Sequence, residues 1–455
     1  MAAERRPLGA LAPEISHRPP GPSSRAFMER LARVESRDVT FRSDDWPIFW
    51  EEASGANVVD ADGNVYVDLT AAFGVALLGH GHPSVVEAVR TQVGRLIHGM
   101  GDVHPPTVKL ELLERLTELA PWPAARAVLA STGAEAVEIA LKTAWLATGR
   151  PGILAFEGGY HGLTLGALAT TARSHFRRPF EGRLYSGVAF APFPVKTDDH
   201  RLGLGAEDAL EVVREMLARG APNGDPIGTV LVEPVQGRAG ARIPPPGFMA
   251  VLSDVAREAG ALVVADEVMT GIGRCGVFLA SRKVGLEPDL VCLGKALGGG
   301  MPVSACVGPA SVMDAWPESR GEAVHTSTFL GHPTACAASL AVLDVVEREA
   351  VPRRAELLGG RLVEGLRQQL DGVAGVSEVR GLGLLLGVEL AGVDGAPRPG
   401  AAVRVAEAAL AEGVLVLPSG DEGHVVELTP PVCLGEEQAG IAVDVLSAAI
   451  REVVR

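Results

Sequence analysis

The chain has 455 residues, of which 47% are hydrophobic and 21% charged, and its formal net charge at pH 7 is −15. This length and apolar content suffice for one large core or two moderate ones, which excludes a peptide module and a largely disordered chain. The longest apolar stretches are strand-sized, so no membrane span is expected. The negative net charge argues against nucleic acid or an anionic membrane as the main partner. It does not exclude a small anionic ligand.

The cysteines and the N-terminal segment indicate in which cellular compartment the protein is expected. The five cysteines are scattered and form no C-x-x-C pair, so neither a disulfide framework nor a thiolate zinc site is indicated. The first 24 residues are rich in proline and lack the apolar region of a signal peptide. We therefore expect a flexible arm at the N-terminus and a reduced, cytoplasmic protein.

The N-terminal part of the chain divides into two expected segments. Residues 1–45 comprise the proline-rich arm and a short amphipathic helix near 26–35. Residues 46–80 contain a hairpin signal, because apolar and polar side chains alternate on both sides of Asp62-Gly63.

The next expected domain covers residues 81–335, where continuous apolar runs alternate with helical patterns. Such strands, buried on both faces and separated by helices, predict an α/β fold with a mostly parallel central sheet. A polar excursion at 173–207 is typical of a functional or interface-forming loop. The expected strands are 127–130, 152–156, 229–232, 261–265 and 290–293, and the expected helices include 134–146, 208–218 and 248–259.

After a helix at about 335–349 the composition shifts to a smaller α/β pattern, which we interpret as a second domain, 336–455. Its expected elements are helices at 355–370 and 436–454 and strands at 383–390 and 414–417.

Ligands of open α/β sheets bind beyond the carboxyl ends of the strands, and several distinctive residues stand at such ends here. Ser131-Thr132-Gly133-Ala134-Glu135 opens a helix, which suits a phosphate but is also an ordinary helix start. Tyr160 follows two glycines and could either stack on a planar ligand or pack over its own turn. Asp266 and Glu267 follow a fully apolar strand, where a carboxylate needs a partner.

Lys295 follows the strand at 290–293 and is one of only a few lysines in a chain whose basic residues are mostly arginine. Its small, uncharged surroundings should lower the pKa of its amine, and lysine can form a Schiff base where arginine cannot. An anion-binding helix start, a stacking ring, an acid and a secluded lysine together predict a site for pyridoxal phosphate.

These residues lie in motifs through which the chain resembles the class III pyridoxal-phosphate aminotransferases of fold type I, the group of 4-aminobutyrate, ornithine and ω-amino-acid transaminases. The resemblance runs from about Trp46 to the C-terminus. The matching stretches include GHGHP at 79–83, STGAEAVE at 131–138, FEGGYHG at 156–162, EPVQG at 233–237, DEVMTGIGRCG at 266–276, PDLVCLGK at 288–295 and VRGLG at 379–383.

The resemblance implies the following roles. Lys295 is the Schiff-base lysine and proton shuttle, and Asp266 pairs with the pyridine nitrogen. The other implied cofactor contacts are Val268 and Tyr160 on the two ring faces, Gly133 and Ala134 at the phosphate, Glu233 and Gln236 near the ring hydroxyl, and Thr328 at the phosphate of a neighbouring subunit in a homodimer. It gives His80, His82 and Glu267 structural roles, and a metal pair of the two histidines is a minor alternative.

Substrate recognition departs from the family's pattern. The resemblance makes Arg380 the ligand of the substrate α-carboxylate, but the acidic residue expected after the Gln-Gly pair is Arg238 here. Either the two arginines hold a dicarboxylate, or Arg238 faces solvent. We hypothesise an altered acceptor such as pyruvate.

The leading hypothesis is thus an aminotransferase that moves an amino group from an amine or ω-amino acid to a 2-oxo acid. The alternatives are an aminomutase, epimerase, decarboxylase or lyase on the same scaffold, because the fold does not fix which bond is broken. A non-enzymatic sensor or structural protein would keep Lys295 and Asp266 without using them.

Overall fold

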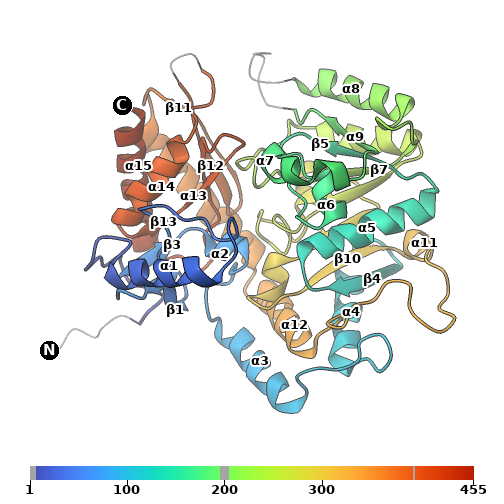
Figure 1. Ribbon diagram of the computed structural model, residues 1–455, viewed down its shortest axis with the longest axis horizontal. Coiled ribbons are helices and arrows are strands. Elements are labelled where there is room, and N and C mark those ends of the chain that lie inside the picture. The colour runs from blue at the N-terminus through green and yellow to red at the C-terminus, as the bar shows by residue number, and fades with distance from the viewer. Residues whose placement is uncertain (1–6, 195–203, 393–394) are drawn as a thin grey trace. The chain divides into compact units, whose positions relative to one another are not determined.

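The computed structural model describes residues 7–194, 204–392 and 395–455, and its chain divides into two compact units (Figure 1). The first unit combines residues 1–82 with 356–455, and the second comprises 83–355. We expected the division between the two α/β parts after residue 335. It lies 20 residues later because the helix that begins at Pro333 packs within the second unit, against helices that begin at Pro83 and Thr107.

A seven-stranded sheet forms the core of the second unit, in the order β4-β10-β9-β8-β7-β5-β6. Five neighbouring strands, from β9 to β6, are parallel, and only β10 runs antiparallel to its neighbours β4 and β9. The strands are β4 (Ala125–Ala130), β5 (Gly152–Phe156), β6 (Val188–Ala191), β7 (Ile227–Val232), β8 (Leu262–Asp266), β9 (Leu290–Leu293) and β10 (Ser304–Pro309). The predicted mostly parallel α/β sheet is confirmed.

Helices cover this sheet. Helix α5 packs against β4, β7, β9 and β10, while α9 packs against β8 and α8 against β6. The longer helices are α3 (Pro83–Arg95), α4 (Thr107–Leu119), α5 (Gly133–Thr148), α8 (Ala206–Arg219), α9 (Phe248–Glu258) and α12 (Pro333–Arg348). The short ones are α6 (Leu165–Thr170), α7 (Ser174–Arg177), η1 (Arg178–Arg183), α10 (Ala280–Val284), η2 (Lys295–Gly298) and α11 (Ala310–Met313).

The first unit contains two four-stranded sheets, β1-β2-β3-β13 and β11-β12-β15-β14. Its strands are β1 (Trp50–Ser54), β2 (Asn57–Asp60), β3 (Val65–Asp68), β11 (Val376–Leu382), β12 (Leu385–Leu390), β13 (Val414–Leu415), β14 (Leu417–Ser419) and β15 (Val425–Leu428). Its helices are α1 (Pro22–Val34), α2 (Ala71–Gly74), α14 (Ala401–Ala411) and α15 (Glu436–Val454), and α13 (Val351–Leu370) crosses the division. No helix in the described ranges has the length and apolarity needed to cross a bilayer.

The predicted hairpin is confirmed as the antiparallel pair β2 and β3. The separate segment expected at 46–80 nevertheless belongs to the same unit as the C-terminal part, because Val414 of β13 pairs in parallel with Val67 of β3. Backbone pairing between distant segments of the chain leaves no local sequence signal, and the expected boundaries missed it.

The expected flexible arm is fixed over much of its length. The Asn57 Oδ1 accepts hydrogen bonds from the N–H groups of Gly9 (3.0 Å) and Leu11 (2.9 Å), and Asn64 Oδ1 accepts those of Ser16 and His17. The two asparagines belong to the hairpin, which therefore provides acceptors for four backbone N–H groups of the arm. Residues 1–6 of the arm lie outside the described residues.

A buried polar cluster stabilises the hairpin. The Tyr66 hydroxyl, fully buried, donates to Asp60 Oδ2 at 2.7 Å and accepts from Asn64 Nδ2 at 3.1 Å. Burial and the neighbouring Asp60 carboxylate both raise the pKa of the Tyr66 hydroxyl, so it stays a donor.

Tyr66→Phe should therefore lower the free energy of unfolding by about 1–3 kcal/mol, because it leaves a buried carboxylate oxygen short of one donor. Urea unfolding measures the loss. Tyr185→Phe is the matched control, since its hydroxyl bonds Asp225 at an exposed position and should cost less than about 1 kcal/mol. Equal losses in the two variants would contradict the role given to the buried cluster.

Candidate active site

The strands of the seven-stranded sheet deliver the predicted site residues to one edge. Strands β5, β7, β8 and β9 are parallel, and β4 points the same way because it pairs antiparallel with β10, as β9 does. Their carboxyl ends lead into five segments. These segments contain Gly133 after β4, Tyr160 after β5, Glu233 after β7, Asp266 in the last position of β8 and Lys295 after β9.

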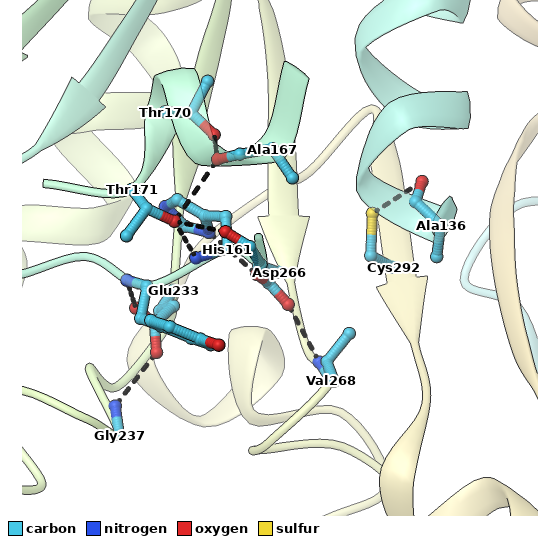
Figure 2. A network of polar contacts seen from close by, with 12 residues as sticks. Ala136, His161, Ala167, Thr170, Thr171, Glu233, Gly237, Asp266, Val268 and Cys292 are labelled. Atoms are coloured by element: carbon cyan, nitrogen blue, oxygen red, sulfur yellow. Dashed lines mark hydrogen bonds and ion pairs between the residues drawn. The ribbon is translucent and has the colours of Figure 1, made fainter. Parts of the chain in front are cut away.

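A buried carboxylate and an imidazole form the centre of this edge (Figure 2). Asp266 Oδ2 lies 2.7 Å from His161 Nδ1, and Asp266 Oδ1 accepts the Val268 N–H at 3.1 Å. Asp266 and His161 are 4% and 3% exposed. Both oxygens of Asp266 are therefore oriented by partners, as a carboxylate at the end of an apolar strand requires.

Glu233 is the third buried acid-base group at this edge, and it fixes two loops. Its Oε1 accepts the Tyr160 N–H at 3.0 Å, and its Oε2 accepts the Gly237 N–H at 2.9 Å. The loop that holds the Tyr160 ring and the turn after Gln236 are thus tied to one carboxylate.

Burial and mutual charge shift the pKa values of this cluster. Burial alone would lower the pKa of His161, but the hydrogen bond and charge of Asp266 outweigh it, and the net direction is upward. Burial raises the pKa of Glu233 to about 7; Asp266 adds to the increase, while His161 and the two backbone N–H groups oppose it. A histidine that favours its charged form thus stands beside Asp266, and the carboxyl group of Glu233 changes its protonation state near neutral pH.

The N-terminus of α5 has the geometry of an anion site. A capping box joins Thr132 and Glu135: Thr132 Oγ1 accepts the Glu135 N–H, and Glu135 Oε2 accepts the N–H groups of Ser131 and Thr132. Among the described residues, the N–H groups of Gly133 and Ala134 have no acceptor. Two donors at the positive end of a helix dipole are available for a phosphate.

Glycines let Val268 approach the start of α5. A Cβ on Gly133 would lie 2.9 Å from Val268 Cγ1, and one on Gly294 would lie 3.2 Å from the same atom. The half-buried Val268 side chain therefore lies between the helix start and the segment just before Lys295. A side chain at Gly133 would force Val268 to move, and one at Gly294 would crowd the same methyl group.

Lys295 begins the short helix η2 directly after β9 and is half-buried. Its φ of +42° is in the left-handed region, which is unfavourable for a residue with a side chain. Strain of this kind persists only where the surrounding structure imposes it, and it concentrates at functional sites. Gln236 also lies near this edge; its Nε2 donates to Glu157 O at 2.8 Å, while its buried Oε1 has no partner among the described residues.

Three further predicted site residues belong to other segments. Thr328 is exposed in the segment between α11 and α12, and Arg380 belongs to β11 of the other unit. Arg238, which the sequence left either beside Arg380 on a dicarboxylate or facing solvent, is half-buried near Tyr160. Glu267 accepts hydrogen bonds from Thr270 and the backbone at the start of α10, and His80 pairs with Asp68 at 2.8 Å.

No group of three potential metal ligands occurs among the residues that the structure describes. The expected site did not include His161, although this histidine directly follows Tyr160 in the matched motif. Its adjacency to an aromatic residue at a strand end is a usable signal, but its partner, 105 residues away, is not visible in the sequence.

The Glu233 pKa predicts a pH-dependent stability. Its folded value of about 7 exceeds the ordinary 4.5, so its contribution favours folding at low pH and is lost as the pH rises from 4.5 through 7. Because His161 is shifted in the same direction, its contribution has the same sign. Glu233→Gln should remove up to about 3 kcal/mol of the decrease in unfolding free energy between pH 5 and 8.

Urea unfolding of the cofactor-free protein across that range measures the effect. Glu211→Gln, at an exposed position of α8, is the control and should keep the wild-type profile. A Glu233→Gln profile parallel to that of wild type would show that Glu233 ionises normally.

Comparisons with known proteins identify the family of the chain. The family model described as aminotransferase class III matches residues 39–450. An acetylornithine aminotransferase from Methanopyrus kandleri is 38% identical, over 89% of this chain and 95% of its own length. An alanine/serine racemase from Pyrococcus horikoshii is 32% identical, over 97% of this chain and 93% of its own.

Among solved structures, the amine transaminase from an uncultivated Pseudomonas species with pyridoxal phosphate bound superposes with a TM-score of 0.83. It shares 30% identity and covers 92% of this chain and 98% of its own. The chain therefore belongs to the class III aminotransferases, pyridoxal-phosphate-dependent enzymes of the α/β fold type I.

Proposed function

We propose that the chain moves an amino group from an amine or ω-amino acid to a 2-oxo acid, with Lys295 and Asp266 as its catalytic residues. The observation that carries the assignment is their placement: Asp266 ends β8, Lys295 comes directly after the neighbouring parallel strand β9, and Asp266 is oriented there by His161. Two features of the same edge support the fit of the cofactor. The Gly133 and Ala134 N–H groups await an acceptor, and the buried Gln236 Oε1 awaits a donor such as the ring hydroxyl.

Each residue then has a defined task. When bound, pyridoxal phosphate supplies a ring that withdraws electrons from the substrate carbon. Lys295 would hold this ring covalently through Nζ and, once displaced by the amine, carry a proton to and from the reacting carbon. Asp266 would keep a proton on the ring nitrogen, and His161 holds its carboxylate in place. Val268 and Tyr160 would contact the two ring faces.

A second subunit completes this proposal. The second unit has exposed apolar side chains in the loop after α3, in the first turn of α4 and in the turn before α12. They are Ile97 (60% exposed), Met100 (52%), Val103 (63%), Leu110 (57%) and Phe329 (58%). The His98 and Phe329 rings are 5.3 Å apart, so the two segments adjoin. Such a surface is typical of a protein interface, and exposed Thr328 lies next to it.

We propose that this apolar surface meets a second copy of the chain, so that Thr328 reaches the partner's phosphate site. We also propose a reducing, cytoplasmic compartment. Cys292 and Cys306 occupy directly opposite positions on β9 and β10 and are both free thiols.

A racemase or epimerase is the second candidate, and the similarity to the Pyrococcus horikoshii racemase is the observation that favours it. The same fold also supports a mutase or a lyase, because a fold does not determine which reaction it catalyses. An aminotransferase keeps the substrate's amino group on the cofactor after the first product leaves, whereas a racemase returns it. Amine exchange in the absence of an acceptor therefore separates the candidates.

Lys295→Ala should abolish turnover, by at least about a thousandfold, because it removes both the covalent attachment and the proton carrier. In wild type, the near-visible band of bound cofactor should bleach on adding an amine without any acceptor. Borohydride should fix the cofactor mass to wild type and not to the variant. Lys142→Ala, at an exposed position of α5, is the control and should behave as wild type.

Two outcomes would contradict this proposal. Appreciable turnover by Lys295→Ala would overturn the lysine's role. A wild-type band that no amine bleaches would favour the racemase, mutase or lyase.

Ile97→Asp should convert the dimer to monomer or weaken it at least about tenfold, because a charge would be buried at the interface. Light scattering after size exclusion measures the mass. Leu357→Asp is the control, since Leu357 is similarly exposed (56%) but belongs to the other unit. A wild-type protein that is monomeric, or a dimer that Ile97→Asp leaves intact, would contradict this interface.

A further inference from the structure

A buried hydroxyl holds the backbone of His161, the histidine that orients Asp266 (Figure 2). The His161 N–H donates to Thr171 Oγ1 at 2.9 Å, and the single proton of this hydroxyl can go to Gly162 O at 3.0 Å or to Ala167 O at 3.2 Å. Thr171 and His161 are both buried. The hydroxyl therefore satisfies an N–H group that burial would otherwise leave without an acceptor.

Thr171 directly follows helix α6, and a carboxylate from another helix holds the start of α6. Glu138 belongs to α5, and its Oε1 accepts the Thr164 hydroxyl at 2.7 Å and the N–H groups of Gly166 at 3.0 Å and Ala167 at 3.3 Å. A helix of six residues is too short to be stable by itself. The place of α6 therefore depends on this carboxylate, which satisfies donors that the start of a helix leaves open.

A guanidinium group holds the other end of α6. Arg177 Nη1 donates to Thr171 O at 3.2 Å and also to Ala169 O, so it satisfies carbonyl groups that the end of a helix leaves open. The same guanidinium lies 4.7 Å from the centre of the Phe190 ring, which belongs to β6. The position of the Thr171 hydroxyl is thus set by contacts with α5 at one end of α6 and with the central sheet at the other.

Two consecutive peptide groups are therefore fixed by two different side chains. The Tyr160 N–H donates to Glu233 Oε1 at 3.0 Å, and the next N–H along the chain, that of His161, donates to Thr171. With this backbone fixed, the His161 Nδ1 lies 2.7 Å from Asp266 Oδ2. A hydrogen bond weakens once its heavy atoms separate beyond about 3.2 Å. A small movement of the His161 backbone would therefore be enough to lose this contact.

We propose that Thr171 is a positioning residue for the reaction, because its hydroxyl holds His161 against Asp266 and so keeps Asp266 ready to hold the proton of the cofactor ring nitrogen. This inference rests on the proposed function, in which Asp266 has that task. Without the Thr171 hydroxyl, the His161 backbone would move toward another acceptor. Burial would then dominate the imidazole, and the pKa of His161 would fall, because the hydrogen bond and the charge of Asp266 are what raise it.

Neighbouring threonines provide a matched pair of variants. Thr171→Val removes the hydroxyl and keeps the shape of the side chain. Thr170→Val is the control, because Thr170 is equally buried and its hydroxyl donates to Ala167 O at 2.8 Å, within its own helix. Each valine variant loses a buried hydroxyl, so an effect on stability alone would be the same in both. Thr171→Ser keeps the hydroxyl and should behave as wild type.

The first measurement is the pKa of His161 in the full-length protein before cofactor is added. NMR of protein labelled in the histidine rings gives this pKa, and His161→Gln identifies the signal. Thr171→Val should lower the pKa of His161 by at least about one unit, whereas Thr170→Val and Thr171→Ser should keep it. With cofactor bound, an amine should bleach the near-visible band at least about tenfold more slowly in Thr171→Val and at the wild-type rate in the other two variants.

An unchanged pKa of His161 in Thr171→Val would overturn the inference, and so would an equal decrease in Thr170→Val. A lowered pKa with an unchanged rate of bleaching would also overturn it. If Thr171→Val does not fold, Glu138→Ala takes its place because it releases the other end of α6, and a wild-type pKa of His161 in that variant would then be the contradicting result. If no amine bleaches the wild-type band, the proposed function fails, but the NMR titration needs no turnover and still decides whether Thr171 positions His161.

Discussion

The buried Asp266 carboxylate at the end of β8 is the constraint on which the rest of the site depends. A charge at the end of an apolar strand is costly unless hydrogen-bond donors orient it, and His161 and the Val268 N–H do so. His161 can serve only if the loop after β5 returns to the sheet edge. Glu233 secures that loop through the Tyr160 N–H, and its second oxygen fixes the turn before Arg238. One acid thus determines where an aromatic ring and an arginine lie.

At the start of α5, too, one carboxylate orders the backbone of the site. Glu135 satisfies the Ser131 and Thr132 N–H groups with its own carboxylate, which anchors the turn before the helix. The donors left over are those of Gly133 and Ala134, and Gly133 is next to Val268. The capping box therefore does more than begin a helix. It decides which backbone groups face a ligand.

A structural feature could be predicted from the sequence where the residues that form it are close together in the chain. Strands β5, β7, β8 and β9 were predictable because continuous apolar runs mark strands buried on both faces, and their last residues then locate Tyr160, Glu233, Asp266 and Lys295. Strands β6 and β10 were missed. The first is a short edge strand inside a polar segment, and the second begins with small residues and runs against its neighbours. The pairing of β3 with β13 joins residues far apart in the chain and set the unit boundaries differently from those expected.

Arg380 shows the same limit at the level of charge, since its Nη1 lies 2.6 Å from Glu378 Oε2 and 2.5 Å from Glu389 Oε2. Glu378 was visible two residues before Arg380, but the position of Glu389 depends on the register of β11 and β12, which includes an irregularity between Val376 and Glu378. A shift of one residue would turn Glu389 to the opposite face and leave Arg380 with a single partner. The motif alone therefore identifies the arginine without saying whether its charge is available.

That distinction matters in a chain whose net charge is −15. An anionic substrate gains nothing from the average field of such a protein, so its recognition depends on a local positive pole. Glu378 and Glu389 bring two carboxylates to Arg380, so the register of β11 and β12 determines how much positive charge this arginine can offer to a ligand.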